Sequence, residues 1–373
     1  MALPVVPAVL DTLMRFRLAK ASRKCRSRAT AGTVPPLRWL AVVPARGEGR
    51  AVEPTLRSLQ EAARGHTVRI VVLMDGPDEA TAACCRELGV ETVLKTPAGP
   101  SKGAALAWLV REAGRLMADA DAVLLMDVGS QASPGLFDAL VMDEGVDGLQ
   151  TRLRGTGSGT GLAAAHSERV GQEWEDRGRQ TLGWAVRLRG TGTALTTRAL
   201  AWVALRLRTR IEDLEATLLL ASAGYRLELA DAEVVDLKPS LISDAARQRA
   251  RWLTGRVHLA LRHPLALGRL FLRRPGEAIA FAIELASRPL SLTALLRLLV
   301  AAALAVSAAA GAGQPWLEAA VAALLVASVM GDLAIVQLAG SIDWRSAAKL
   351  ASAWVGAVLL APRALWRWTR VRR

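Results

Sequence analysis

The chain has 373 residues, of which 52% are apolar and only 4% aromatic, and it carries a formal net charge of +14. Its length allows one large domain or two smaller ones. Proteins that bind single-stranded nucleic acid interleave aromatic with basic side chains, and aromatic residues are scarce here. We therefore expect no nucleic-acid partner.

Most of the positive charge lies in the two tails. Residues 1–28 contain seven Lys or Arg against Asp11, and residues 344–373 contain seven with no acid, so the tails contribute +6 and +7, or +13 of the +14. Basic segments that flank apolar ones are typical of the cytoplasmic face of a membrane. We expect an inner- or plasma-membrane protein with a cytoplasmic catalytic region.

Residues 1–37 are expected to form a basic, membrane-proximal arm. The opening stretch MALPVVPAVLDTLMRF is apolar, but it is short and interrupted by proline, which argues against a membrane span. A signal peptide places its positive charge before its apolar core, and here that order is reversed. An interfacial segment or the remnant of a lost anchor is the expected structure.

Residues 38–245 alternate between short apolar runs and helical patterns, which predicts an α/β domain with a parallel, Rossmann-like sheet. In such sheets ligands bind beyond the carboxyl ends of the strands, and polar residues follow three of the expected strands. The expected strands cover residues 37–45, 68–76, 90–97 and 120–127, and the expected helices cover residues 53–65, 79–89 and 102–117.

The composition changes after this domain. Residues 246–290 are expected to form a basic amphipathic helix and an interface helix. Two long apolar stretches within residues 291–342, separated by the turn GQPW, predict a transmembrane hairpin. Residues 343–373 are expected to be interfacial or re-entrant with a basic tail, because a further crossing would place the arginine-rich end outside.

Two charges within the expected hairpin need an explanation. Arg297 precedes the turn by about as many residues as Asp332 follows it, so antiparallel helices place the two side chains at similar depth. Pairing would offset the cost of burying either charge alone. The alternative is that Arg297 extends to the cytoplasmic surface while Asp332 faces protein. The sequence leaves both arrangements open.

Six short features follow one another along the chain: VVPARGE (42–48), VVLMDG (71–76), SKG (101–103), LLMDVGS (124–130), IEDLE (211–215) and QRARW (248–252). Each is weak alone, but their order and spacing on an α/β domain resemble the family-2 glycosyltransferases. These are inverting enzymes of the GT-A fold, and the resemblance is greatest to the membrane-bound branch of cellulose-, chitin- and hyaluronan-synthase-like proteins. The resemblance covers roughly residues 38–340.

The resemblance implies a binding site for a nucleotide sugar, with a UDP-sugar as the expected donor. Asp75 matches the acid that reads the base, and Lys102 is placed to meet a phosphate or the base. A solvated helix start is the alternative for Lys102. The nucleoside would be held by the turn that contains Pro44, Ala45 and Glu48.

Asp127 matches the first acid of an aspartate–any–aspartate pair that binds Mg²⁺ or Mn²⁺ on the diphosphate. Gly129 stands where the second acid is usual. Mg²⁺ often needs only one or two carboxylates when phosphates and water complete its coordination. Ser130 or Gln131 could assist through oxygen, the metal could bind weakly, or activity could be impaired, and these alternatives stay open.

Asp213 matches the catalytic base, which takes the proton of the acceptor hydroxyl. Its place near a helix start favours its charged form, and Glu212 beside it is expected on the acceptor side. The alternative is that these acids only cap the helix. In the QxxRW signature, Gln248 and Arg251 are expected near the diphosphate and Trp252 against the acceptor sugar. Binding of the same basic helix to lipid headgroups is compatible with that role.

The sequence thus predicts a membrane-anchored hexosyl- or N-acetylhexosaminyltransferase that acts with inversion on a hydroxyl of a polysaccharide or lipid acceptor. Membrane lipids are expected partners, and the oligomeric state is unknown. The alternative function is that of a catalytically degenerate subunit, which binds nucleotide or a partner within a polysaccharide synthase complex. Gly129 favours that alternative, whereas Asp213 and the complete QxxRW signature speak against it.

Overall fold

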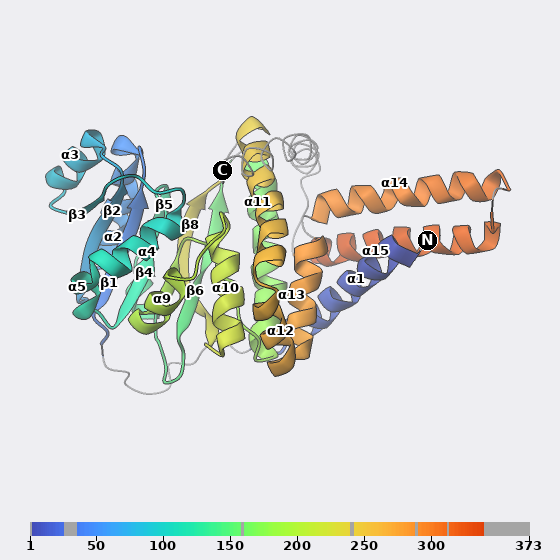
Figure 1. Cartoon of the computed structure of the whole chain (residues 1–373), viewed down its shortest axis with the longest axis horizontal. Coiled ribbons are helices and arrows are strands. Elements are labelled where there is room, and N and C mark those ends of the chain that lie inside the picture. The colour runs from blue at the N-terminus through green and yellow to red at the C-terminus, as the bar shows by residue number, and fades with distance from the viewer. Residues whose placement is uncertain are drawn as a thin grey trace. The chain divides into compact units, whose positions relative to one another are not determined.

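A mixed β-sheet organises the middle of the chain, with its strands in the order β3-β2-β1-β4-β7-β6-β8-β5 (Figure 1). The structure is a computed structural model that describes residues 2–25, 36–157, 160–238, 242–287, 290–311 and 313–338. The strands of this sheet are β1 (Trp39–Ala45), β2 (Val68–Asp75), β3 (Glu91–Lys95), β4 (Ala122–Leu125), β5 (Ser130–Ala132), β6 (Gly148–Thr156), β7 (Thr193–Thr196) and β8 (Leu227–Leu237).

The first four strands are parallel, which confirms the α/β prediction for this part of the chain. β1 lies between β2 and β4, and β3 pairs with the outer side of β2. Ala45 is opposite Met74 and Val42 is opposite Leu125, so the carboxyl ends of β1, β2 and β4 reach the same edge of the sheet. The residues that follow these ends therefore share one side of the domain.

The other half of the sheet differs from the expected parallel arrangement. β7 is antiparallel to both β4 and β6, β8 is parallel to β6, and β5 is antiparallel to β8. The sheet is therefore mixed rather than wholly parallel. The antiparallel β7 lies between the parallel half, at β4, and the half that contains β6, β8 and β5.

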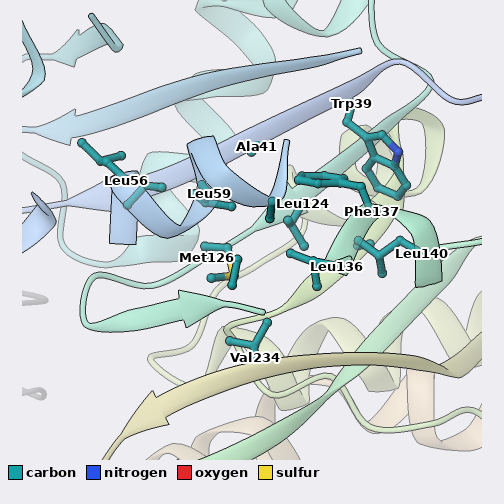
Figure 2. Close-up of a cluster of buried hydrophobic side chains, with 14 of the residues drawn as sticks. Trp39, Ala41, Leu56, Leu59, Leu124, Met126, Leu136, Phe137, Leu140 and Val234 are labelled. Carbon is teal, nitrogen blue, oxygen red and sulfur yellow. The ribbon is translucent and has the colours of Figure 1, made fainter. Parts of the chain in front are cut away.

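A hydrophobic core covers one face of the sheet (Figure 2). Leu56 and Leu59 of α2 (Glu53–Ala62) and Leu136 of α6 (Leu136–Ala139) contribute to it. They pack in one cluster with Ala41 of β1 and Leu124 of β4. Alternate residues of a strand point to opposite faces, so these strand residues line the same side of the sheet.

The opposite face is also covered. Leu40 and Val42, which alternate with the core residues of β1, are fully buried as well. On this face, α9 (Thr197–Ala204) packs between α4 (Lys102–Glu112) and α10 (Glu212–Ala223). Both α4 and α9 also contact strands of the sheet. The helices of this part of the chain not yet given are α3 (Glu79–Glu87), α5 (Gly114–Ala118) and α8 (Arg177–Thr181).

The chain divides into two compact units. The sheet unit contains residues 25–156 and 179–237, and the helical unit contains residues 1–24, 157–178 and 238–373. The helices of the helical unit are α1 (Ala2–Ser22), α7 (Thr160–Val170), a π-helical turn (Gly171–Asp176), α11 (Ile242–Arg262), α12 (Pro264–Arg273), α13 (Pro275–Ser287), α14 (Leu290–Ala309) and α15 (Pro315–Leu338).

Within the helical unit, α14 and α15 form a long hairpin, and α1 lies against α15 (Figure 1). Among the described residues, the stretch Pro315–Ala334 of α15 is long and apolar enough to cross a bilayer, whereas Ala294–Ala309 of α14 is apolar but shorter. The predicted helical hairpin is present, and its membrane crossing stays a prediction. The expected interfacial segment at residues 343–373 lies outside the described residues.

Candidate active site

Lys102 is the central cation of the site. It begins α4, whose preceding Ser101 accepts a hydrogen bond from the Ala104 amide and so caps the helix. The Lys102 ammonium donates to the carboxylate of Asp127 and to the carbonyl oxygen of Gly190 (2.8 Å). It also lies 3.8 Å from a carboxylate oxygen of Glu212. Lys102 is thus an ion-paired group within the site rather than a solvated helix start.

The electrostatic environment keeps Lys102 charged. Burial opposes its charge, but the carboxylates of Asp127 and Glu212 outweigh burial and raise the pKa of Lys102. Burial raises the pKa of Glu212, and the nearby Lys102 ammonium offsets this only in part. The Lys102 ammonium therefore interacts with the carboxylates of Asp127, Glu212 and Asp213, and the last two belong to the first turn of α10.

Asp213 is the second residue of α10, which agrees with its predicted place near a helix start. The helix start was expected to favour the charged form of Asp213, but the surroundings favour the protonated form. Burial raises the pKa of Asp213, and the amide of Leu214, which donates to its carboxylate at 2.8 Å, together with Lys102 only partly offsets this. Desolvation of the charged form exceeds the favourable helix-terminus effect. The result is a carboxyl group whose proton affinity suits a general base better than that of an exposed aspartate.

Gly190 marks the point where these groups converge. A Cβ atom built on Gly190 would lie 3.7 Å from Asp127 Oδ2, 3.8 Å from Lys102 Nζ and 3.9 Å from Asp213 Oδ2. Residues from the end of β4, the start of α4 and the start of α10, far apart in the sequence, thus surround one point. A side chain at position 190 would fill the space between them, and the φ of +83° also favours glycine there.

The loop that carries Gly190 is held by Gln150 of β6. The side-chain oxygen of Gln150 accepts from the Arg189 amide (2.8 Å) and the Thr193 hydroxyl (2.9 Å), while its nitrogen donates to the Thr191 carbonyl (3.0 Å). Thr191 in turn accepts from the amide of Asp127 at 3.0 Å. Gly190, Gln150 and Thr191 were not predicted as site residues from the sequence.

Asp75 lies at the end of β2, on the same edge of the sheet. Its Oδ1 accepts from Lys95 Nζ (2.9 Å) and from the Gly99 amide (2.7 Å), and its Oδ2 lies 3.8 Å from an Arg46 nitrogen. Because β1 lies between β2 and β4, the strand ends that carry Asp75 and Asp127 are about 10 Å apart across the sheet. An extended ligand is needed to reach both, and the partners Lys95 and Arg46 were not anticipated from the sequence.

The turn after β1 brings Glu48 near the acidic groups. Partial burial, followed by the carboxylates of Asp127 and Asp78, raises the pKa of Glu48. Pro44 and Ala45 are the last residues of β1, between the strands that lead to Asp75 and Asp127. The turn therefore lies on the same edge as both acids, as the sequence predicts.

The protein groups at Asp127 determine what metal chemistry is feasible. Asp127 supplies one carboxylate, and among the described residues no group of three or more His, Cys, Asp or Glu side chains forms a metal-binding cluster. Ser130 is buried and its hydroxyl accepts from Thr191 (2.9 Å). This donor set does not enclose an ion by itself, but it fits Mg²⁺ or a similar ion that takes its other ligands from phosphate and water.

Gly129 adopts a conformation that few other residues tolerate. Its φ is +90°, its amide donates to the hydroxyl of Thr55 (3.0 Å), and nothing lies within 4 Å of a Cβ built on it. The position usually held by the second acid therefore has room for a side chain, and the backbone rather than space disfavours one.

Glu215 stabilises the loop that precedes α10. It is fully buried, and its carboxylate accepts from the amides of Arg208 (2.8 Å) and Thr209 (2.7 Å) and from the Thr209 hydroxyl (2.9 Å). These bonds fasten the loop before α10 to the helix that carries Asp213. Glu215 therefore has a structural task that the IEDLE motif alone did not reveal.

The QxxRW residues lie in α11 of the helical unit. Gln248 is half-buried, while Arg251 and Trp252 are exposed. Their spacing of three and four residues places them on one side of the helix, as expected. Their part in the site stays a prediction.

Residues 35–255 match the family described as glycosyltransferase like family 2, which is more than half of the chain. The chain therefore belongs to this glycosyltransferase-like family. No curated protein sequence matches it.

The fold has counterparts among solved structures. A mannosyltransferase from Pyrobaculum calidifontis, solved with GDP-Man and Mn²⁺, is 17% identical over 88% of this chain and 99% of its own, with a TM-score of 0.52. Glucosyl-3-phosphoglycerate synthase from Mycobacterium tuberculosis, solved with Mn²⁺ and UDP, is 17% identical over 63% of this chain and 80% of its own, with a TM-score of 0.38. Mannosyl-3-phosphoglycerate synthase from Rubrobacter xylanophilus is 16% identical over 70% and 79%, with a TM-score of 0.38. The first similarity identifies the GT-A glycosyltransferase fold, which confirms the predicted fold class.

Proposed function

We propose that the chain transfers a sugar, with inversion, from a nucleoside diphosphate sugar to a hydroxyl group of a polysaccharide or lipid acceptor at a membrane. The observation that carries this proposal is the convergence of Asp127, Lys102 and Asp213 at Gly190. A metal-binding carboxylate, a cation and a carboxyl base are the groups that such a transfer requires.

Asp213 acts as the base. The acceptor hydroxyl oxygen attacks the anomeric carbon, the bond from that carbon to the diphosphate oxygen breaks, and the hydroxyl proton passes to the Asp213 carboxylate. Attack from the side opposite the leaving group inverts the configuration. The raised pKa of Asp213 makes it a stronger base than an ordinary aspartate.

The departing diphosphate carries the negative charge. Lys102 would stabilise that charge from a fixed position, because the carbonyl of Gly190 and the Asp127 carboxylate already orient its ammonium group. Asp127 would hold Mg²⁺ or Mn²⁺, which supplies Lewis-acid stabilisation of the diphosphate when it is bound. Gln248 and Arg251 are assigned to the same diphosphate.

The nucleoside would bind at the ends of β1 and β2. Asp75 has one oxygen occupied by Lys95 and Gly99, which leaves Oδ2 to accept from a ring N–H of uracil or guanine. Glu48 suits the ribose hydroxyls, and Pro44 and Ala45 line the turn beside it. A UDP-sugar is our first candidate donor.

The acceptor side is assigned to Glu212 and Trp252. An aromatic ring offers an apolar face to a sugar ring, and the complete QxxRW signature supports the assignment to the synthase-like branch. The helical hairpin of α14 and α15 would anchor the chain in the inner or plasma membrane, with the sheet unit in the cytoplasm. Anchoring would keep the site close to a lipid or a growing polysaccharide.

The proposal is tested by incubating the purified full chain with a panel of UDP- and GDP-sugars, with Mg²⁺ and Mn²⁺ supplied separately. We expect nucleoside diphosphate to be released with one nucleotide sugar of the panel and not with the others. Proton NMR of the product should show the inverted anomeric configuration. Asp213→Asn should lower the transfer rate at least about 100-fold while donor binding persists. Asp138→Asn, which alters an exposed carboxylate paired with His66, serves as the matched control.

Donor binding without turnover by the unmodified chain, unaffected by Asp213→Asn, would contradict the enzymatic proposal. That result would favour the degenerate nucleotide-binding subunit, for which Gly129 is the supporting feature. Transfer with retention would instead contradict the assigned role of Asp213.

A further inference from the structure

Four charged side chains form a buried cluster within the helical unit. Arg297 of α14 donates to Asp332 of α15 (2.8 Å) and to Asp11 of α1 (3.1 Å). Arg15 of α1 donates to Asp11 (3.3 Å) and lies 3.7 Å from Asp332. The pairing of Arg297 with Asp332 is therefore one of the two arrangements that the sequence left open. The participation of the N-terminal helix was not anticipated.

The cluster has no net formal charge. It contains two acids and two bases, and each of the four residues is at most 7% exposed. Removing one partner from such a buried set leaves an uncompensated charge, which is strongly unfavourable. α1 contributes one acid and one base, and α14 and α15 contribute one of each between them, so the ion pairs Arg297–Asp11 and Arg15–Asp332 join α1 to the hairpin.

Apart from the basic end of α1, the outer surface of these helices carries many exposed apolar side chains. This polarity is the reverse of that of a water-soluble helical bundle, in which charges face outward, and it is typical of helices that face lipid. The exposed large apolar side chains on α1, α14 and α15 include Leu13, Phe16, Leu299, Val306, Leu324 and Met330.

A glycine contact gives independent evidence that α1 packs closely on α15. A Cβ atom built on Gly331 would lie 3.2 Å from Thr12 Cγ2 and 3.5 Å from a ring carbon of Phe16. The Thr12 hydroxyl also lies 3.5 Å from the carbonyl oxygen of Ser328. Small residues at helix contacts let backbones approach closely, which is the usual packing of membrane helices.

The contacts fix the relative direction of the two helices. Thr12 meets Ser328, and Arg15, one turn later, meets Asp332, one turn later on α15. The helices therefore run in the same direction. The C-terminal end of α1 accordingly lies toward the end of α15 and away from the hairpin turn. This end carries the exposed basic residues Arg17, Lys20, Arg23 and Lys24.

We propose that α1 is a third membrane-embedded helix, inserted with its N-terminal end leading and locked to the hairpin by the neutral charge cluster. Its basic end would lie among the cytoplasmic headgroups, which follows the positive-inside tendency. The occupant of its apolar face is the acyl region of the bilayer. The proposal rests on the membrane anchoring in the proposed function and extends it to a segment expected to be interfacial.

The depth of α1 can be measured by spin labelling of the full chain in liposomes. Cysteines are introduced singly at Leu13, Phe16, Leu324 and Lys24, after Cys25, Cys84 and Cys85 are changed to serine. We expect labels at Leu13, Phe16 and Leu324 to collide with oxygen rather than with a water-soluble nickel complex. The label at Lys24 should show the opposite preference.

The outcomes separate two failures. If the labels at Leu13 and Phe16 behave like the one at Lys24 while Leu324 remains deep, the hairpin is anchored and the proposal for α1 is wrong. If Leu324 is also accessible to the nickel complex, the membrane anchoring of the proposed function fails as well. Transfer activity of the labelled variants reports separately on the sheet unit.

Charge balance provides the second test. Asp11→Leu should lower the yield of membrane-inserted protein several-fold, because it leaves a net positive charge in the cluster. The double variant Asp11→Leu with Arg15→Leu keeps Arg297 paired with Asp332 and should recover most of that yield. A double variant as impaired as the single one would show that charge balance does not hold α1 in place.

Discussion

Lys102 and Asp127 neutralise each other at the point where the diphosphate of a donor would bind. Their ion pair joins the start of α4 to the residue that follows β4, so neither charge depends on the ligand for compensation. The pair is also connected to Glu212, 3.8 Å from the same ammonium group.

Replacing Lys102 with methionine should abolish most transfer activity. The substitution keeps much of the side-chain volume but leaves Asp127, Glu212 and Asp213 without their shared cation. Loss of one preorganised stabilising group typically lowers kcat by about 100-fold or more. Steady-state kinetics should show this loss, whereas Arg69→Met, which removes a cation from the exposed pair with Glu91, should leave kcat unchanged. Near-normal kcat for Lys102→Met would contradict the assignment.

The pH dependence of kcat/KM should report the raised pKa of Asp213. The base must be ionised, so the rate rises with pH through a pKa above the ordinary aspartate value of 3.8. Because the folded state holds this proton more tightly than the unfolded chain, the associated stability is present at low pH and is lost as pH rises through the folded pKa. An acidic limb at or below pH 3.8, with the fold intact by circular dichroism, would be inconsistent with this base.

Introducing an acid at position 129 should strengthen metal binding. Gly129→Asp places a second carboxylate in open space near Asp127, so the Mg²⁺ concentration for half-maximal activity should fall several-fold. The positive φ should cost about 1 kcal/mol or more of stability. Gly183→Asp, at an exposed glycine with φ +68° and open space, measures this backbone cost alone. An unchanged metal requirement would show that residue 129 does not face the ion.

Removing the carboxylate of Glu215 should destabilise the sheet unit. Glu215→Ala leaves the part-buried amide of Arg208 and the buried amide of Thr209 without their acceptor, which should lower the free energy of unfolding by about 2 kcal/mol or more. Urea denaturation followed by circular dichroism measures the change. Glu91→Gln, at an exposed ion pair, should shift the midpoint little. A small effect for Glu215→Ala would mean that the loop before α10 is held by other contacts.

The parallel half of the sheet could be predicted because its signals are local. Each strand from β1 to β4 is a short apolar run bounded by turn residues, and helices separate them. Because parallel strands share an edge, the positions of Asp75 and Asp127 at strand ends were enough to predict their common side. The same reasoning placed Asp213 at a helix start.

The remaining features depend on contacts that periodicity does not encode. β7 has only four residues, and its antiparallel pairing with β4 and β6 is not visible in its composition. The proximity of Gly190 to Asp127 follows from that pairing. Likewise, Asp11 and Arg15 looked like ordinary charges of a basic arm, because their partners Arg297 and Asp332 lie at the other end of the chain.

The bonds that Gln150 makes to the loop of Gly190 determine how the site meets a ligand. Both polar atoms of that side chain are engaged by the loop backbone or by Thr193, so the loop that carries Gly190 is held by bonds within the protein. Because these bonds are present before a donor binds, we expect little entropy to be lost in ordering this segment. We therefore expect discrimination among sugars at this point to come from shape complementarity more than from closure around the ligand.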